Sequence, residues 1–189
     1  MILAIIPARR GSKRLPGKNY MLINGISLVD RAQRVAKESG IFDHIHIATD
    51  ENRHPYICDD QVQTAAVVFD TLCKLNYAYD EFCVLNPTTP TRTAEMLREG
   101  YLTFRGTACL ASIGGNYRHD GAFLFWRTLD FLRYLSRSVI PGYTPVKETF
   151  CVDINDSSDF RRAEKILIER EGYTGFFSAS KEPGTFEKW

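Results

Sequence analysis

Short apolar runs alternate with amphipathic stretches along the first half of the chain. Short runs bounded by turn residues are typical of strands, and apolar residues three and four positions apart are typical of helices. In chain order, we expect a strand at residues 3–6, a helix at 27–39, a strand at 44–48, a helix at 62–75 and a strand at 82–85. Ser27 and Gly40 are residue types that begin and end helices, which supports the bounds of the first one.

The second half of the chain continues the same pattern. Thr93 is expected to cap a helix that runs through Phe104. The later elements expected are strands at 107–112 and 122–125, a helix at 129–135, a strand at 149–152 and a helix at 158–169. The alternation favours an α/β fold with a mostly parallel sheet, as one domain over residues 1–189 with an irregular tail from about residue 172.

Polar segments follow several of the predicted strands. In open α/β sheets, ligands bind beyond the carboxyl ends of the strands. The sequence therefore predicts that one edge of the sheet carries the functional residues, in four segments: residues 8–19, 49–50, 86–92 and 153–156.

The composition adds little to this picture. A chain of 189 residues with 44% hydrophobic and 25% charged residues is ordinary for a globular domain, and a net charge of +1 gives no field that would gather nucleic acid or a membrane surface. The five cysteines have no metal-ligand spacing, and we expect them to be reduced and mostly buried in a cytoplasmic protein: Cys58, Cys73, Cys83, Cys109 and Cys151.

The segment after the first strand is strongly basic. Residues 7–19 read Pro-Ala-Arg-Arg-Gly-Ser-Lys-Arg-Leu-Pro-Gly-Lys-Asn, with five cations among loop-shaping glycines and prolines. Glycines let backbone N–H groups approach a phosphate, and cations neutralise it, so this loop predicts a phosphate site. A P-loop, which would hydrolyse ATP or GTP, is the less favoured reading: five residues separate Gly11 from Gly17, Asn19 follows Lys18, and the turn at Asn24-Gly25 delays the helix.

The same loop resembles the first motif of the sugar-activating cytidylyltransferases, the family that includes the acylneuraminate and 3-deoxy-manno-octulosonate enzymes. Further similarities follow in order: residues 48–50, Asp60 with Thr64, 85–92, 120–125, and 152–155 with Asp159. The resemblance implies a Rossmann-like, three-layer α/β/α nucleotidyltransferase fold. It also implies transfer of CMP from CTP to a sialic acid-like or octulosonate-like sugar, with Mg²⁺ and release of pyrophosphate.

By this resemblance, site residues can be assigned to four roles. Nucleotide binding falls to Ala8, Arg9, Gly11, Ser12, Lys13, Lys18, Asn19, Asp50, Arg53 and Thr64. Sugar binding falls to Asn86, Thr88, Thr89 and Arg92. Metal binding falls to Asp153 and Asn155, and catalysis to Arg9, Lys18 and Asp153. Two alternatives stay open: residues 86–92 could be only a turn, and Asp153 and Asp156 could cap the next helix, the role we prefer for Asp156.

The chain also departs from the family pattern. It is shortened between Asp50 and Asp60, and between residues 112 and 119, where the family carries a dimerisation segment, so a homodimer is uncertain. Asn155 replaces a second acidic residue and lowers the expected metal affinity, because an amide contributes no charge. A second hypothesis is therefore a nucleotide-binding relative without catalysis. His44 and His46 would share one face of a strand, and we expect them to be structural or solvent-facing rather than metal ligands.

Overall fold

A computed structural model describes residues 1–11, 15–54, 63–114, 118–137 and 146–172. Its main sheet has six strands in the order β4-β1-β5-β7-β6-β8. They are β1 (Ile2–Pro7), β4 (His44–Ala48), β5 (Glu81–Val84), β6 (Cys109–Ile113), β7 (His119–Arg127) and β8 (Val146–Glu148). β1 is parallel to β4 and β5, β6 is parallel to β8, and β7 is antiparallel to both of its neighbours. The predicted mostly parallel sheet is confirmed.

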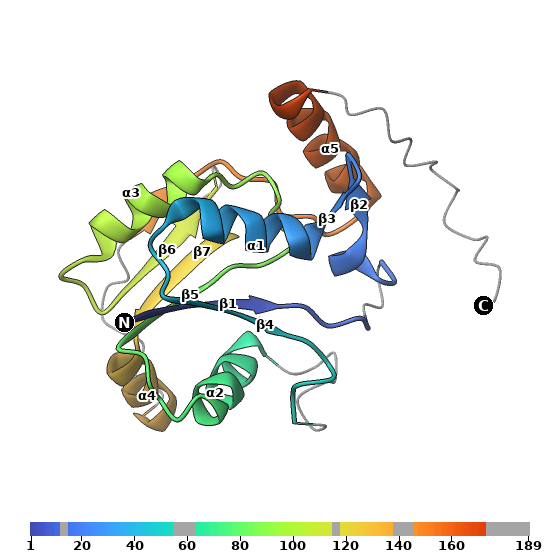
Figure 1. Ribbon diagram of the computed structural model, residues 1–189. Helices are drawn as coiled ribbons and strands as arrows, with labels where there is room; N and C mark the ends of the chain where they lie inside the picture. The colour runs from blue at the N-terminus through green and yellow to red at the C-terminus, as the bar shows by residue number, and fades with distance from the viewer. Residues whose placement is uncertain (12–14, 55–62, 115–117, 138–145, 173–189) are drawn as a thin grey trace.

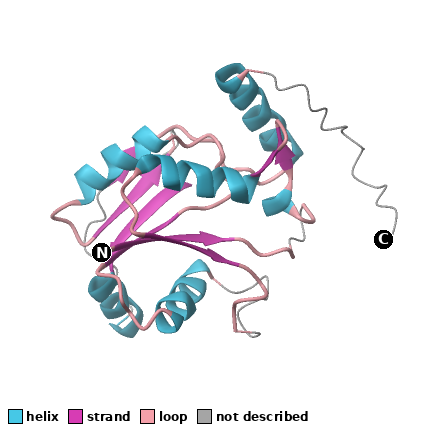
Figure 2. Cartoon of the chain, viewed as in Figure 1, coloured by secondary structure: helices cyan, strands magenta, loops and turns pink. Residues whose placement is uncertain are grey.

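Helices cover both faces of this sheet, as Figures 1 and 2 show. α1 (Leu28–Ser39) and α3 (Ala94–Phe104) lie on one face, and α2 (Thr64–Lys74) and α4 (Thr128–Arg137) lie on the other. Strand alternation separates the two cores, because Ala4 and Ile6 pack with α1 and α3 whereas Leu3 and Ile5 pack with α2. The predicted three-layer α/β/α fold is confirmed.

Close packing on the α1 and α3 face depends on a glycine. A Cβ built at Gly100 in α3 would lie 2.8 Å from Cζ of Phe123 in β7. Phe123 is fully buried, and its ring packs 5.3 Å from that of Phe125. The helix can therefore approach the sheet closely only because position 100 has no side chain.

A small hairpin and the last helix stand beside the sheet (Figure 1). β2 (Leu22–Ile23) and β3 (Ile26–Ser27) are joined by Asn24 at φ 52° and Gly25 at φ 77°, the conformation of a tight hairpin turn. α5 (Ser157–Glu171) packs on this hairpin through a third apolar cluster: Ile23, Leu28, Val152, Ile154, Ala163 and Leu167. The predicted Asn24-Gly25 turn is confirmed.

Most predicted elements lie within a few residues of the observed ones. Ser27 accepts a hydrogen bond from the backbone N–H of Asp30, and Thr93 accepts one from that of Met96, so both predicted caps are confirmed. The predicted strand at 149–152 is wrong, since the strand in this region is β8 at 146–148 and the chain leaves the sheet after it. The tail beyond residue 172 lies outside the described residues.

No helix in the described ranges is both long and apolar enough to cross a membrane.

Candidate active site

The four predicted polar segments meet at one edge of the sheet. This edge holds the carboxyl ends of β1, β4 and β5 and, because β7 runs the opposite way, its beginning at His119. The N–H of Arg10 donates to Oδ2 of Asp50 (2.7 Å), which joins the basic loop to the segment after β4. Lys18 Nζ donates to the carbonyl of Ile154 (2.7 Å), which joins the loop to the predicted metal segment.

The basic loop is closed by its own last residues. Asn19 is buried, and its Nδ2 donates to the carbonyl of Arg9 (2.9 Å), while the hydroxyl of Tyr20 donates to the carbonyl of Ala8 (2.9 Å). Gly17 has a φ of 67° and begins a single 3-10 turn, Lys18–Tyr20. The N–H of Ala8 donates to the carbonyl of Ala48 (2.9 Å). Asn19 and Ala8, both predicted to contact the nucleotide, are therefore hydrogen-bonded within the protein and stabilise the loop conformation.

Arg9, Gly11 and Lys18 form the described part of the predicted phosphate surface. Gly11 is exposed, and among the described residues, its chain neighbours aside, no atom lies within 4 Å of the position a Cβ would take there. Arg9 and Lys18 are partly exposed. Ser12 and Lys13, also predicted to bind nucleotide, lie outside the described residues.

The segment after β4 is structured by hydrogen bonds to its own backbone. Arg53 is buried, and its guanidinium donates to the carbonyl of Ala48 (2.6 Å). Asn52 accepts from the N–H of Thr49 (2.8 Å) and donates to the carbonyl of Ile47 (2.8 Å). Arg53 was predicted to contact the nucleotide base. Its buried guanidinium instead bonds to the last residue of β4, which does not fit that role.

Arg92 shows the largest departure from the predicted roles. Its side chain is fully buried, and its two terminal nitrogens donate to the carbonyls of Ala122 (2.6 Å) and Asn86. Burial lowers the pKa of Arg92 to about 10. Arg92 therefore holds the 86–92 segment against β7 from a fully buried position, and the sugar contact predicted for it stays a prediction.

The two threonines of this segment differ from each other in burial. Thr89 is fully buried and donates to the carbonyl of Asp120 (2.8 Å), so it too is part of the scaffold rather than a sugar contact. Thr88 is partly exposed, and its hydroxyl donates to Oδ1 of Asp153 (2.7 Å). Thr88 therefore lies where the 86–92 segment meets the predicted metal segment.

A hollow of about 220 Å³ opens at this edge between β5, β7 and α2. It is lined by Thr64, Val84, Asn86, His119 and Leu124. Two of these residues, Thr64 and Asn86, are predicted site residues, and His119 lies beside them. The ring nitrogen Nδ1 of His119 accepts from the N–H of Gly121 (3.2 Å), which in the neutral ring leaves Nε2 as the donor.

A larger hollow of about 500 Å³ lies at the opposite end of β5, against α4. Several of its charged groups bond within the protein: Arg133 pairs with Asp130 (3.1 Å), and Glu81 accepts from the hydroxyl of Tyr101 (3.0 Å). None of the four predicted segments reaches it. We therefore place the candidate active site at the carboxyl edge, despite the smaller volume there.

Asp153 and Asn155 offer an incomplete set of metal ligands. Oδ2 of Asp153 accepts from Nδ2 of Asn155 (3.1 Å), so the amide presents its nitrogen to the carboxylate. No group of three or more His, Cys, Asp or Glu residues that could hold a metal occurs in the part of the chain that the structure describes. Mg²⁺ is commonly held by one or two carboxylates together with substrate phosphates and water, and the residues fit an ion that arrives with a triphosphate.

Two further predictions concern carboxylate and histidine side chains. Asp156 accepts from the N–H groups of Ser158 (2.8 Å) and Asp159 (3.0 Å), which lowers its pKa and confirms it as a helix cap.

His44 bonds to the hydroxyl of Tyr79 through Nδ1 (2.7 Å), and its ring packs edge-on against that of His46 at 6.4 Å. Both histidines are thus engaged in packing, as predicted.

Comparisons with known proteins agree with this architecture. A solved structure of CMP:2-keto-3-deoxy-manno-octonic acid synthetase complexed with CTP superposes with a TM-score of 0.70, covering 89% of this chain and 99% of that one, at 12% identity. At that identity the likeness concerns the fold, which is that of a nucleotidyltransferase.

Sequence comparisons find similarity to cytidylyltransferases over part of the chain. Residues 3–75 match the family model described as cytidylyltransferase. The chain is 32% identical over 121 residues to a pseudaminic acid cytidylyltransferase of Campylobacter jejuni, covering 54% of this chain and 52% of the relative. It is 34% identical over 119 residues to a CMP-N,N'-diacetyllegionaminic acid synthase of Legionella pneumophila, covering 51% and 50%. The chain is similar to these sugar-activating cytidylyltransferases, and it spans about half the length of the curated relatives it matches.

Proposed function

We propose that this chain transfers CMP from CTP to an acidic sugar and releases pyrophosphate. The observation that carries the proposal is the bond from Lys18 to the carbonyl of Ile154, because it sets a cation of the basic loop beside the carboxylate of Asp153. A triphosphate needs both cations and a metal-binding carboxylate. Longer matches are to proteins named for pseudaminic and legionaminic acid, and shorter matches are to proteins named for 3-deoxy-manno-octulosonate, which supports an acidic sugar as the acceptor.

The proposed reaction is an in-line displacement without a covalent enzyme intermediate. The anomeric hydroxyl of the sugar attacks the α-phosphorus of CTP, the bond to the β-phosphate oxygen breaks, and the hydroxyl proton passes to solvent. Arg9 and Lys18 hold and neutralise the phosphates, with Gly11, Ser12 and Lys13 of the same loop. Asp153, with the amide oxygen of Asn155 after the amide turns, would hold a magnesium ion, which supplies charge neutralisation at the phosphates.

The hollow lined by Thr64, Asn86 and His119 is the proposed sugar subsite. Val84 and Leu124 give it an apolar wall, and the three polar side chains can bond to sugar hydroxyl or amide groups. Thr88 and Asp50 position the adjoining segments by the bonds described above. We assign substrate contact to the residues lining the hollow, and scaffold roles to Thr89 and Arg92.

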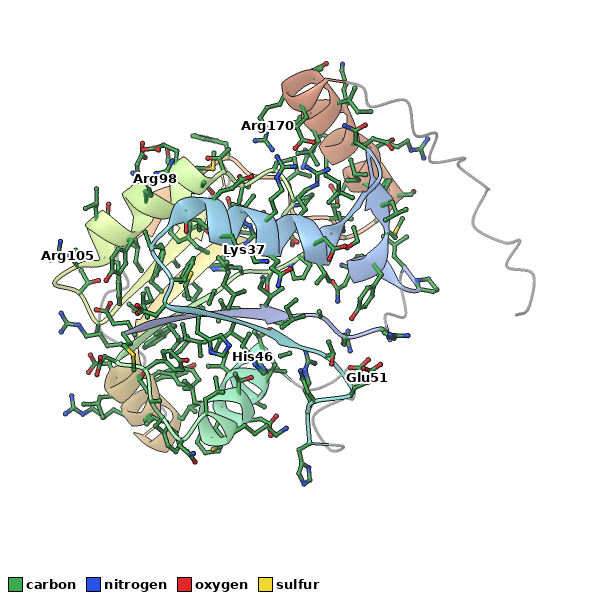
Figure 3. All side chains as sticks on the ribbon, viewed as in Figure 1. Lys37, His46, Glu51, Arg98, Arg105 and Arg170 are labelled. Carbon is green, nitrogen blue, oxygen red and sulfur yellow. The ribbon has the colours of Figure 1, made fainter. Side chains whose placement is uncertain are left out.

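A pyrophosphate-release assay with CTP, Mg²⁺ and a panel of acidic sugars tests the proposal. Lys18→Ala should lower kcat/KM by about two to three orders of magnitude, as loss of a transition-state charge contact does. Lys37→Ala is the matched control, since Lys37 lies on the far turn of α1 away from the edge (Figure 3). Absence of both CTP binding and pyrophosphate release in the wild type would refute the proposal.

A second candidate function is nucleotide binding without catalysis. It is favoured by one observation, the amide nitrogen of Asn155 facing Asp153 where a second carboxylate would strengthen a metal site. It predicts that CTP raises the melting temperature while no sugar in the panel yields pyrophosphate. The P-loop alternative does not fit, because a 3-10 turn and a hairpin separate the basic loop from α1.

A further inference from the structure

Asp120 is the most heavily bonded carboxylate near the candidate site, and the proposed mechanism does not use it. It is buried at the beginning of β7. Oδ1 accepts from the hydroxyl of Ser112 (2.6 Å) and from the N–H of Ala122 (3.1 Å). Oδ2 accepts from the hydroxyl of Thr149 and from the N–H of Cys151 (3.3 Å). One carboxylate thus ties β6 and β7 to the segment that follows β8.

A carboxylate suits this set of donors, because both of its oxygens accept hydrogen bonds. Each of its two oxygens faces one backbone N–H, that of Ala122 on one side and that of Cys151 on the other. An asparagine has a single acceptor oxygen, so in either orientation its NH₂ group would face one of these N–H groups. A buried N–H that loses its acceptor is costly, and the chain around it has to move.

The residue between the two contacts is strained. Phe150 has a φ of 52°, a conformation that is rare for a bulky side chain, and its side chain is 69% exposed. The bonds of Asp120 to Thr149 and Cys151 hold both ends of this turn. Solvent-exposed Phe150 gains little from burial there, so the carboxylate is what keeps the turn in the left-handed conformation.

The strained turn leads directly into the candidate metal segment. After Cys151, the N–H of Val152 donates to the hydroxyl of Thr91 (2.9 Å), and that of Ile154 donates to the carbonyl of Thr88 (2.8 Å). A change of φ at residue 150 would rotate the following backbone and carry Asp153 with it. The position of Asp153 therefore depends on the turn that Asp120 holds.

We propose that Asp120 is a positioning residue that places Asp153 for metal binding by clamping the strained turn at Phe150. The role in metal binding rests on the function proposed above, whereas the effect of Asp120 on the backbone of residues 149–154 does not. It predicts that glycine at position 150, which adopts a positive φ without strain, makes the clamp dispensable.

The test compares wild type, Asp120→Asn, Phe150→Gly and the double variant. In the pyrophosphate assay, Asp120→Asn should raise the Mg²⁺ concentration at half-maximal rate about tenfold and lower kcat, with the KM for CTP changed less than threefold. Phe150→Gly should match wild type within threefold, and the double variant should return to within threefold of wild type. If Asp120→Asn only damaged the fold, kcat, the KM for CTP and the Mg²⁺ requirement would all worsen together. In that case Phe150→Gly would not restore the Mg²⁺ dependence in the double variant.

Amide hydrogen exchange gives a readout that does not depend on turnover. In apo protein, peptides covering residues 149–155 should exchange at least tenfold faster in Asp120→Asn and return toward the wild-type rate in the double variant. An unchanged Mg²⁺ dependence and exchange rate in Asp120→Asn, or a double variant no better than Asp120→Asn, would overturn the proposal. If the wild type releases no pyrophosphate, the proposed function fails, while the exchange data still decide whether Asp120 holds the turn.

Discussion

Replacing Asn155 by aspartate tests the arrangement of the candidate metal site most directly. In the structure, the amide nitrogen of Asn155 donates to Oδ2 of Asp153 over 3.1 Å at an exposed position. Asn155→Asp turns this attraction into a repulsion between two carboxylates about 4 Å apart, worth about 1 kcal/mol in a water-like dielectric. Loss of an exposed hydrogen bond adds about 0.5–1 kcal/mol. Without metal, the free energy of unfolding should therefore fall by about 1–2 kcal/mol.

The same substitution should act in the opposite direction when metal and nucleotide are present. A second carboxylate attracts a divalent cation that the two side chains and the triphosphate share. An extra 1 kcal/mol of attraction lowers the Mg²⁺ concentration at half-maximal rate about fivefold. If the chain binds CTP without catalysis because the metal is held weakly, pyrophosphate release should appear or rise in this variant.

Urea unfolding in EDTA and a Mg²⁺ titration of pyrophosphate release measure the two effects. Asn155→Ala is the matched control, since it removes the hydrogen bond without adding a charge and should lower stability by less than 1 kcal/mol. The reasoning is refuted if Asn155→Asp is as stable as Asn155→Ala in EDTA and shows the wild-type Mg²⁺ dependence. That result would mean that the two side chains do not share an ion.

Three other variants test packing, burial and titration. Gly100→Ala places a Cβ 2.8 Å from the Phe123 ring, and urea unfolding should show a loss of about 1–3 kcal/mol; an unchanged midpoint would contradict the packing. Arg92→Met leaves two buried carbonyls without their donors and should cost about 3 kcal/mol in the same assay, whereas a cost below 1 kcal/mol would indicate that the fork is not formed. Burial lowers the pKa of His46, so the unfolded chain takes up its proton first and stability should fall as the pH drops below about 6.5; His46→Gln, unfolded at pH 7.5 and 5.5, should lose less than wild type.

Local signals in the sequence predicted the elements around the basic loop well. The apolar run of β1, the Asn24-Gly25 turn and the cap at Ser27 each depend on residues close to one another in the chain. The edge on which the polar segments gather also follows from local signals, because parallel strands bring their carboxyl ends together. These are the features for which short-range rules are sufficient.

The burial of Arg92 could not be predicted in this way. An arginine after Pro-Thr-Thr-Pro-Thr has the sequence context of an exposed turn, and the resemblance to known enzymes indicated a ligand contact. Its actual partners are the carbonyls of Asn86 and Ala122, and the second of these lies 30 residues away on β7. Arg92 has this role because β7 pairs with β5 in the antiparallel direction, which brings Ala122 beside it. The sequence around Arg92 contains no signal of that pairing.

A strand was predicted at 149–152, but the strand in this region is β8 at 146–148, and residues 149–155 follow its end. The N–H of Thr149 still donates to the carbonyl of Ile113 in β6. Further along, the N–H of Val152 donates to the hydroxyl of Thr91, and that of Ile154 donates to the carbonyl of Thr88. On its other side, Ile154 packs with Leu167 of α5 in the third apolar cluster. Because Lys18 also donates to the carbonyl of Ile154, α5 and the basic loop both hold this short segment, and the position of Asp153 depends on helix packing as well as on the sheet.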